Sequence, residues 1–220
     1  MHRRLLLTSQ GIQPELEDVF LSCLGEAPER KRVSFITTAA RGEGTYYPKW
    51  MDIYKKQLEG CGIKNIEEMD LKGKTPRDTR QALSDKEIIF VNGGNTFYLL
   101  HWARKSGFCE LLPELLKEGK FYVGVSAGSY IVCPTIEAAT WKRQDRNMIG
   151  LKDLTGLNLI PFLISAHFEE KYRPTIERAA RNTAYPIVAL YDTQAVLVED
   201  SIYKVVGTGK REFFNGFKEG

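Results

Sequence analysis

The chain alternates short runs of apolar, often β-branched residues with longer stretches in which apolar and charged residues recur at helical spacing. A strand buried on both faces of a parallel sheet is apolar at nearly every position, so the short runs predict such strands. The intervening stretches predict amphipathic helices, and several of them close with glycine, which commonly follows the last turn of a helix. The strands are expected at 4–9, 32–40, 87–94, 121–128 and 187–193, and the helices at 14–25, 47–62, 95–107 and 109–119.

The repeated order of strand and helix predicts an α/β fold with a doubly wound, mostly parallel sheet and helices on both faces. Ligands of such sheets bind at the carboxyl ends of the strands. The C-terminal part reads differently, because the apolar runs 195–200 and 201–207 follow one another directly and predict a hairpin at the sheet edge. With 220 residues and no linker or repeat, we expect a single domain over 1–220.

Charge and composition narrow the function classes. The 31 basic and 28 acidic residues are interspersed and give a net charge of +3, which does not indicate a nucleic-acid or membrane surface. The apolar part of the opening residues "MHRRLLLTSQ" is too short for a signal peptide, so we expect a cytoplasmic protein. The four widely spaced cysteines predict reduced, mostly buried thiols and no metal site.

The most informative stretch is Gly124-Val125-Ser126-Ala127-Gly128, which follows an expected strand and precedes a short helical stretch stopped by Pro134. This context suits a nucleophile elbow, because glycines on either side relieve crowding in a sharp turn that raises the serine hydroxyl above the sheet edge. The amide of Ala127 then begins a helix, where the dipole favours a developing negative charge. The alternative is a plain strand-to-helix turn built from small residues.

A second glycine-rich loop, "VNGGNTFYLL" at 91–100, also follows an expected strand and opens a helix. In a parallel sheet it would lie at the same edge as Ser126, where its amides could complete an oxyanion hole. A phosphate-binding role is disfavoured, because neither GxGxxG nor GxxxxGK[ST] occurs in the loop.

A nucleophilic serine needs a base, and the chain has three histidines. His2 stands at the start of the chain and His101 within an expected helix, whereas His167 directly follows an apolar run that resembles another strand. That position would bring the imidazole to the active edge, and its ordinary pKa of about 6.5 suits proton transfer at neutral pH.

The blocks "GGNTFYLL", "GVSAGSYIVCPTI" and "LIPFLISAHF" together resemble the peptidase E family of serine peptidases, which includes aspartyl dipeptidase and is related to cyanophycinase. The resemblance implies a fold similar to class I glutamine amidotransferases, a Ser-His-acid triad and a substrate with an acidic residue. Carried over by position, Ser126 is the nucleophile and His167 the base, and the amides of Gly94 and Ala127 form the oxyanion hole.

The third member of the triad is harder to place. The family has a carboxylate between the serine and the histidine, and this chain has a slightly longer segment there, at 137–150. Asp145 is the preferred acid, and Glu137 fits if the loop folds back differently. Asp192 and Asp153 are weaker alternatives, since an acid only has to reach the ring nitrogen opposite the serine.

An acidic substrate group is best held by a guanidinium, and Arg173 corresponds roughly to an arginine that the family uses for this purpose. Asn95 is a second expected substrate-binding residue. The short connection between His167 and Arg173 resembles the cyanophycinase-like branch, which makes strict dipeptide preference doubtful. We expect a small-peptide substrate and no cofactor; the sequence is compatible with a homodimer.

Two other functions fit parts of the pattern. An α/β-hydrolase esterase shares GxSxG and the order serine, acid, histidine, but its histidine usually lies near the C-terminus, whereas 53 residues follow His167 here. A non-catalytic ligand-binding module on an amidotransferase-like scaffold is the other, because fold alone does not guarantee chemistry. Residues 41–50, rich in glycine and aromatic side chains, could overhang the pocket in any of these proteins.

Overall fold

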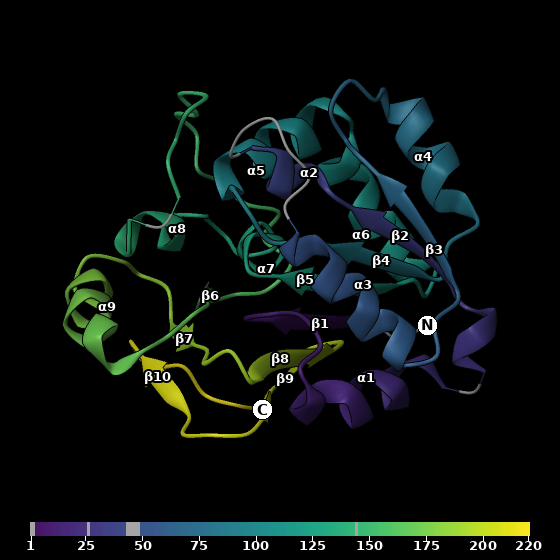
Figure 1. Cartoon of the computed structure of the whole chain (residues 1–220). Helices are drawn as coiled ribbons and strands as arrows, with labels where there is room; N and C mark the ends of the chain where they lie inside the picture. The colour runs from purple at the N-terminus through teal and green to yellow at the C-terminus, as the bar shows by residue number, and fades with distance from the viewer. Residues whose placement is uncertain (1–2, 26, 43–48, 144) are drawn as a thin grey trace.

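Figure 1 shows the computed structural model, which describes residues 3–25, 27–42, 49–143 and 145–220. A seven-stranded sheet with the order β3-β2-β4-β5-β1-β8-β9 forms its centre. The parallel strands are β1 (Arg4–Thr8), β2 (Arg32–Ile36), β3 (Asn65–Met69), β4 (Ile88–Val91) and β5 (Phe121–Val125). The remaining two, β8 (Gln194–Glu199) and β9 (Ile202–Gly207), form an antiparallel hairpin that pairs with β1 at one edge. The predicted mostly parallel sheet and its edge hairpin are thus confirmed.

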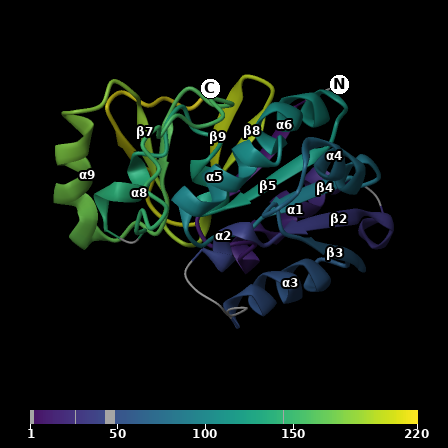
Figure 2. The same ribbon diagram turned by 90° about the horizontal axis from the view of Figure 1, so that it is seen from above.

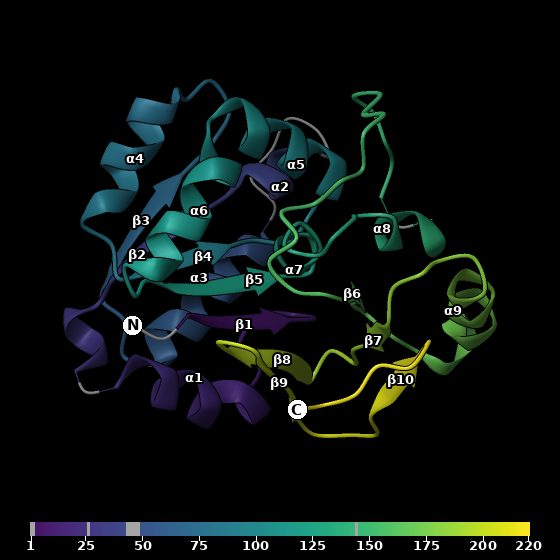
Figure 3. The same cartoon turned by 180° about the vertical axis from the view of Figure 1, so that it is seen from behind.

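Helices cover both faces of this sheet, as the turned view shows (Figure 2). Strand β1 explains why, because its successive leucines point to opposite sides. Leu6 packs into a core with α1 (Glu17–Leu24) and α3 (Trp50–Gly60), whereas Leu5 and Leu7 pack into a second core. That second core includes α4 (Pro76–Ser84), α5 (Thr96–Lys105) and α6 (Phe108–Lys117), which face the viewer in Figure 3.

A second, three-stranded sheet lies beside the carboxyl ends of the main sheet (Figure 1). It consists of β6 (Leu163–Ser165), β7 (Ile187–Ala189) and β10 (Glu212–Phe214), in the order β10-β7-β6. The prediction that 187–193 adds a strand to the main parallel sheet is therefore wrong. Only three of its residues form a strand. This short, buried strand pairs with β6 and β10.

Short helical segments complete the described chain. They are α2 (Thr38–Arg41), α7 (Ala127–Tyr130), α8 (Ala138–Trp141) and α9 (Arg173–Ala180), with 3-10 turns at Pro14–Leu16, Pro28–Arg30 and Glu170–Tyr172. Residues 43–48, the greater part of the connection expected to overhang the pocket, lie outside the described residues. None of the helices within the described ranges is long and apolar enough to cross a membrane.

The sequence pattern missed strand β3, and its composition explains why. The strand reads "NIEEM" and exposes three of its five side chains, so it shows no continuous apolar run. It stands at the edge of the sheet, where one side of the strand lacks a neighbour and charged residues are favoured. The cysteines agree better with expectation, since all four are free thiols and three of them are buried.

Gly124 and Gly128 allow α7 to pack closely against β4 and β5. A Cβ on Gly128 would stand 2.4 Å from the carbonyl oxygen of Val91 in β4, and one on Gly124 would stand 2.6 Å from the carbonyl oxygen of Gly128. Both obstacles are backbone atoms, which cannot rotate away. The turn after β5 therefore requires residues without a Cβ at these two positions.

We expect Gly128→Ala to lower the free energy of unfolding by roughly 1–3 kcal/mol, because the added methyl group would push α7 away from β4. Gly60→Ala is the matched control: a Cβ there meets nothing within 4 Å, and the change should add about 0.4–1 kcal/mol by restricting the unfolded chain. Urea denaturation of both variants measures the difference. Equal stability of the two would contradict this account of the turn.

Candidate active site

Ser126 occupies a sharp turn at the carboxyl end of β5. Its backbone has φ 47° and ψ −102°, a conformation that non-glycine residues rarely adopt and that costs roughly 1–3 kcal/mol. The turn is held on both sides: the amide of Ser126 donates to the carbonyl of Thr8 at 3.0 Å, and its carbonyl accepts from the amides of Ser129 and Tyr130 at 2.8 and 2.9 Å. The result is a serine side chain fixed at the edge of the sheet.

His167 brings its imidazole to this hydroxyl from the smaller sheet. It follows β6, has a left-handed φ of 54°, and places Nε2 3.1 Å from the Oγ of Ser126. Its Nδ1 lies 2.7 Å from Oδ1 of Asp192, which follows β7. Because an ionised carboxylate can only accept, Nδ1 carries the proton and Nε2 is left to accept from the serine hydroxyl.

The electrostatics of Asp192 agree with this assignment. Partial burial raises the pKa of Asp192, but the hydrogen bond and charge of His167 and the hydroxyl of Ser9 outweigh burial, so its pKa lies below the ordinary value. The carboxylate therefore stays charged next to the imidazole at neutral pH. This is the arrangement that stabilises an imidazolium when it forms.

The preferred acid, Asp145, makes its hydrogen bond at the start of α5, whereas Nδ1 of His167 pairs with Asp192. The carboxylate of Asp145 accepts a 2.8 Å hydrogen bond from the amide of Thr96 in the first turn of α5, and burial raises its pKa. Glu137 accepts from the hydroxyl of Thr183 at 2.6 Å. Neither acid is the partner of Nδ1, because Asp192 reaches the ring from the end of a neighbouring strand. The other alternative, Asp153, forms a 3.0 Å ion pair with Arg104.

The second glycine-rich loop lies against Ser126, as its place after a neighbouring parallel strand predicts. A Cβ on Gly93 would stand 3.3 Å from the Cβ of Ser126. Gly94 has φ 125° and passes so close to α2 that a Cβ would stand 2.5 Å from the backbone of Ala39. Ala127 follows Ser126 directly as the first residue of α7.

Both expected substrate-binding residues have protein partners. The side chain of Asn95 is the N-cap of α5: its Oδ1 accepts from the amide of Tyr98 at 2.9 Å, while its Nδ2 donates to the carbonyl of Arg146 at 2.8 Å. This buried amide caps the start of the helix, and its role in substrate binding stays a prediction.

Arg173 begins α9 and lies with its guanidinium carbon 5.5 Å from the ring centroid of Phe168, the residue after His167. It forms ion pairs with the carboxylates of Glu170, through Nε at 2.8 Å, and Glu212, through Nη2 at 2.8 Å. The arginine thus contacts the residue that follows His167, and it already pairs with two acids.

Two residues next to the site were not predicted. Ser9, directly after β1, lies between His167 and Asp192. The ammonium of Lys142 donates to the backbone carbonyls of Ala166 and His167, and burial lowers the pKa of Lys142 to about 8. Of these two residues, only Ser9 could have been found from the sequence. It directly follows a central parallel strand, and such residues lie at the edge of the sheet where ligands bind.

A further histidine, His101, lies outside this arrangement. His101 packs edge-to-face on Trp102 at 5.1 Å, and burial lowers the pKa of His101. His2 lies outside the described residues. Within the residues that the structure describes, no three histidine, cysteine or acidic side chains gather in a way that could hold a metal ion.

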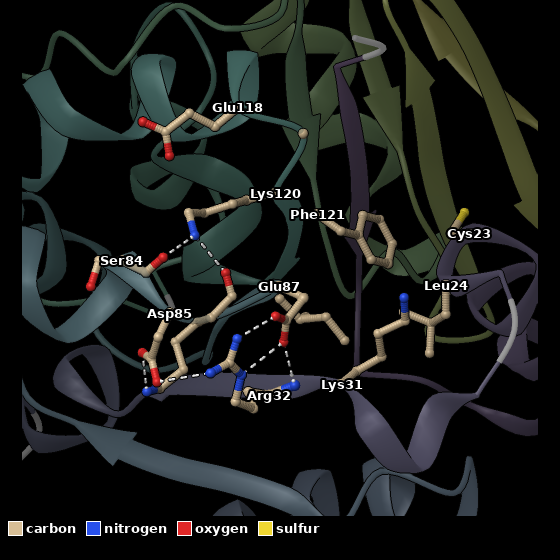
Figure 4. A pocket seen from close by; sticks show the side chains of 13 residues that line it. Cys23, Leu24, Lys31, Arg32, Ser84, Asp85, Glu87, Glu118, Lys120 and Phe121 are labelled. Atoms are coloured by element: carbon tan, nitrogen blue, oxygen red, sulfur yellow. Dashed lines mark hydrogen bonds and ion pairs between the residues drawn. The ribbon is translucent and has the colours of Figure 1, made fainter.

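A pocket of about 270 Å³ lies at the opposite edge of the sheet, where β2, β4 and β5 begin (Figure 4). Several of its charged groups have protein partners: Arg32 forms a 2.7 Å ion pair with Glu87, and Lys120 donates to the backbone carbonyls of Ser84 and Lys86. This pocket and Ser126 lie at opposite ends of β5. The pocket is therefore not part of the site at Ser126.

Comparison with known proteins gives the family of the chain. The model of peptidase family S51 matches residues 5–206. An uncharacterized peptidase of Pasteurella multocida is 29% identical over 88% of this chain and 93% of its own length, and peptidase E of a Nostoc species is 26% identical over 94% and 87%. The crystal structure of a Listeria monocytogenes protein assigned to peptidase E superposes with a TM-score of 0.80 at 24% identity, covering 95% of this chain and all of the other.

These matches define the class, which is that of the serine-type peptidases. The chain belongs to peptidase family S51. A peptidase from an acI-B1 actinobacterium, with a TM-score of 0.68 at 17% identity over 99% of this chain and 92% of that one, shares the fold.

The raised pKa of Asp145 leads to a prediction for stability. The folded protein holds the carboxyl proton of Asp145 more tightly than the unfolded chain does. As the pH rises above the ordinary pKa of 3.8, the contribution of Asp145 to stability therefore falls. Asp145→Asn keeps an oxygen for the Thr96 amide and removes the buried charge. We therefore expect its stability, relative to the parent, to increase from pH 4 to pH 7.

Asp78→Asn is the control with the opposite sign. Hydrogen bonds from Thr75 lower the pKa of Asp78, so its carboxylate stabilises the fold above the ordinary value of 3.8 and this contribution is lost as the pH falls below that value; the variant should be less stable than the parent by a nearly constant amount from pH 5 to pH 7, and the difference should shrink only below about pH 4. Urea titrations at several pH values measure both differences. A flat or falling difference for Asp145→Asn would show that its charge carries no burial cost.

Proposed function

We propose that this protein hydrolyses small peptides with a catalytic triad of Ser126, His167 and Asp192, through an acyl-enzyme. The observation that carries the proposal is the continuous chain of contacts from the Ser126 hydroxyl to the imidazole at 3.1 Å and from the imidazole to the Asp192 carboxylate at 2.7 Å. These distances are within hydrogen-bond reach for proton transfer. The conformation of Ser126, on a strained turn between a strand and a helix, supports its role as a nucleophile elbow.

In the acylation step, Nε2 of His167 takes the hydroxyl proton as the oxygen of Ser126 attacks the peptide carbonyl. The imidazolium then gives this proton to the leaving amine, and the peptide bond breaks. Water repeats the sequence on the acyl-enzyme and releases the acid. Throughout, Asp192 keeps the proton of the ring on Nδ1 and stabilises the positive charge.

The negative charge that develops on the carbonyl oxygen needs donors next to Ser126. The amide of Ala127 follows the nucleophile, and the amide of Gly94 belongs to the loop that lies against it, so we assign the oxyanion hole to these two groups. Glycines at 93 and 94 support this assignment, since a side chain at 93 would crowd Ser126 and one at 94 would collide with the backbone of Ala39. We also propose that the scaffold is of the class I glutamine amidotransferase type, with serine as nucleophile.

We further propose that the enzyme prefers peptides with an aspartate and that Arg173 recognises its carboxylate. The position of Arg173 over Phe168, beside His167, supports this role. Glu170 and Glu212 engage Nε and Nη2, so Nη1 is the nitrogen that a substrate carboxylate would meet. The two glutamates compete with the substrate, which makes the preference weaker than a free guanidinium would give.

Ser126→Ala should lower kcat by about 10⁴- to 10⁶-fold without unfolding the protein, because the nucleophile is lost while the small side chain still fits the turn. A fluorophosphonate probe should label the parent only at Ser126. Folded parent protein that is not labelled would favour a ligand-binding module instead. Turnover of p-nitrophenyl esters with none of Asp-containing peptides would favour an esterase.

The two candidate acids can be separated by a matched pair. Asp192→Asn should lower kcat by about 10²- to 10⁴-fold, because an amide at this place favours the wrong imidazole tautomer. Asp145→Asn should keep kcat within about threefold of the parent, since the side-chain amide oxygen of the variant can still accept from the amide of Thr96. Steady-state kinetics on one Asp-containing dipeptide measures both, and the reverse order of effects would restore Asp145 as the acid.

The preference for aspartate can be tested at Glu170, whose side chain is 61% exposed and can be changed without disturbing the core. Glu170→Gln removes one competing charge from Arg173, so kcat/KM for an Asp-containing peptide should rise several-fold while kcat/KM for the matched Asn-containing peptide stays constant. Arg173→Gln should lower the first value and spare the second. Equal responses of the two peptides would remove Arg173 from substrate recognition.

A further inference from the structure

We propose that Ser9 is a positioning residue of this active site, whose hydroxyl fixes the base and the acid in one relative orientation. The inference rests on the proposed triad and adds a residue from a fourth strand end. Ser9 directly follows β1, the strand beside β5, and its side chain is fully buried. Its own amide donates to the carbonyl of Gln194 at 3.1 Å, which anchors its backbone to the segment that follows Asp192.

The Ser9 hydroxyl makes two contacts, one to each partner of the proposed relay. Its oxygen accepts from the backbone amide of His167 at 2.7 Å and donates to Oδ1 of Asp192 at 2.8 Å. The amide can only donate and the carboxylate can only accept, so a group between them must do both at one atom. A hydroxyl meets this requirement, whereas alanine or a backbone group cannot.

The contact to His167 acts on a strained residue. With φ at 54°, the backbone of His167 occupies the left-handed region, which a residue of this type keeps only when its surroundings hold it there. The hydrogen bond from its amide to Ser9 holds the base from one side, and the contacts of Lys142 with the carbonyls of Ala166 and His167 hold it from the other. The imidazole is thereby aimed at Ser126.

The contact to Asp192 selects the orientation of the acid. Oδ1 of Asp192 receives both the hydroxyl of Ser9 and Nδ1 of His167, so the two donors converge on one carboxylate oxygen. Because the side chain of Asp192 is 46% exposed, water competes for it, and a buried donor is needed to keep this oxygen turned toward the ring. Ser9 supplies that donor from a central strand of the larger sheet.

A buried serine elsewhere shows what a merely structural hydroxyl looks like. Ser106, at the C-terminal end of α5, is also fully buried, but its hydroxyl donates to the carbonyl of Ala103 within its own helix, at 3.3 Å. Ser106→Ala therefore matches Ser9→Ala in chemistry and burial and leaves the site untouched.

The experiment compares Ser9→Ala, Ser9→Thr, Ser106→Ala and Ser126→Ala on one Asp-containing dipeptide. We expect Ser9→Ala to lower kcat by about 10²-fold with KM within about twofold, because the hydroxyl orients the base and acid and does not touch the substrate. Ser9→Thr, which keeps the hydroxyl, should restore much of kcat. Ser106→Ala should behave as the parent, and Ser126→Ala defines the inactive limit.

A second readout separates positioning from general loss of structure. The proton on Nδ1 of His167, held by Asp192, should give a downfield ¹H NMR signal in the parent, and Ser9→Ala should shift or broaden it while Ser106→Ala leaves it unchanged. If Ser9→Ala does not fold, Ser9→Cys takes its place with the same expectation, since a thiol is the weaker donor and acceptor.

The outcomes distinguish this inference from the proposed function. Full turnover by Ser126→Ala would overturn the triad itself. An inactive Ser126→Ala together with parental kcat for Ser9→Ala, or a reduced kcat with an unchanged downfield signal, would overturn the role of Ser9 alone.

Discussion

The contact between the two sheets is the constraint on which the site depends. Ser126 and Ser9 follow strands of the seven-stranded sheet, whereas His167 and Asp192 follow strands of the three-stranded sheet. No chemistry is possible unless the smaller sheet is held at the carboxyl edge of the larger one. The Tyr130 hydroxyl accepts from the amide of Ala166 at 3.0 Å, directly beside the base. One apolar core also continues from the larger sheet through α7 into β6 and β7, so burial fixes the same relation.

Backbone strain is present on both sides of this contact. Ser126 and His167 both have positive φ, although each carries a side chain. Each such residue costs roughly 1–3 kcal/mol, which a small number of hydrogen bonds and a well-packed turn must offset. Burial also lowers the pKa of Lys142 to about 8 while its ammonium holds the carbonyl of His167. Stability is thus given up locally for a fixed geometry, as is common at sites that must be rigid before the substrate arrives.

Most of the larger sheet could be predicted, because strands buried on both faces have a strong apolar signature. The edge strand β3 could not, since its exposed glutamates resemble a loop or helix. The run at 187–193 showed the opposite failure: its apolar character predicted a strand correctly, but composition does not say which sheet a strand joins. In the site, Ser126 and His167 followed from local context. Asp145 was preferred over Asp192 because it stands between the serine and the histidine along the chain. Which acid pairs with the imidazole depends instead on distance in the folded protein.

The sequence by itself determined the alternation of strands and helices, the sharp turn at Ser126 and the place of His167 at a strand end, because each of these depends on a few neighbouring residues. Tertiary structure alone decided which carboxylate faces the imidazole and that Ser9 joins it. Asp192 stands 25 residues after His167 and Ser9 stands 158 before it. No local pattern connects positions so far apart, and they meet only because two sheets place the ends of β1, β5, β6 and β7 around one point.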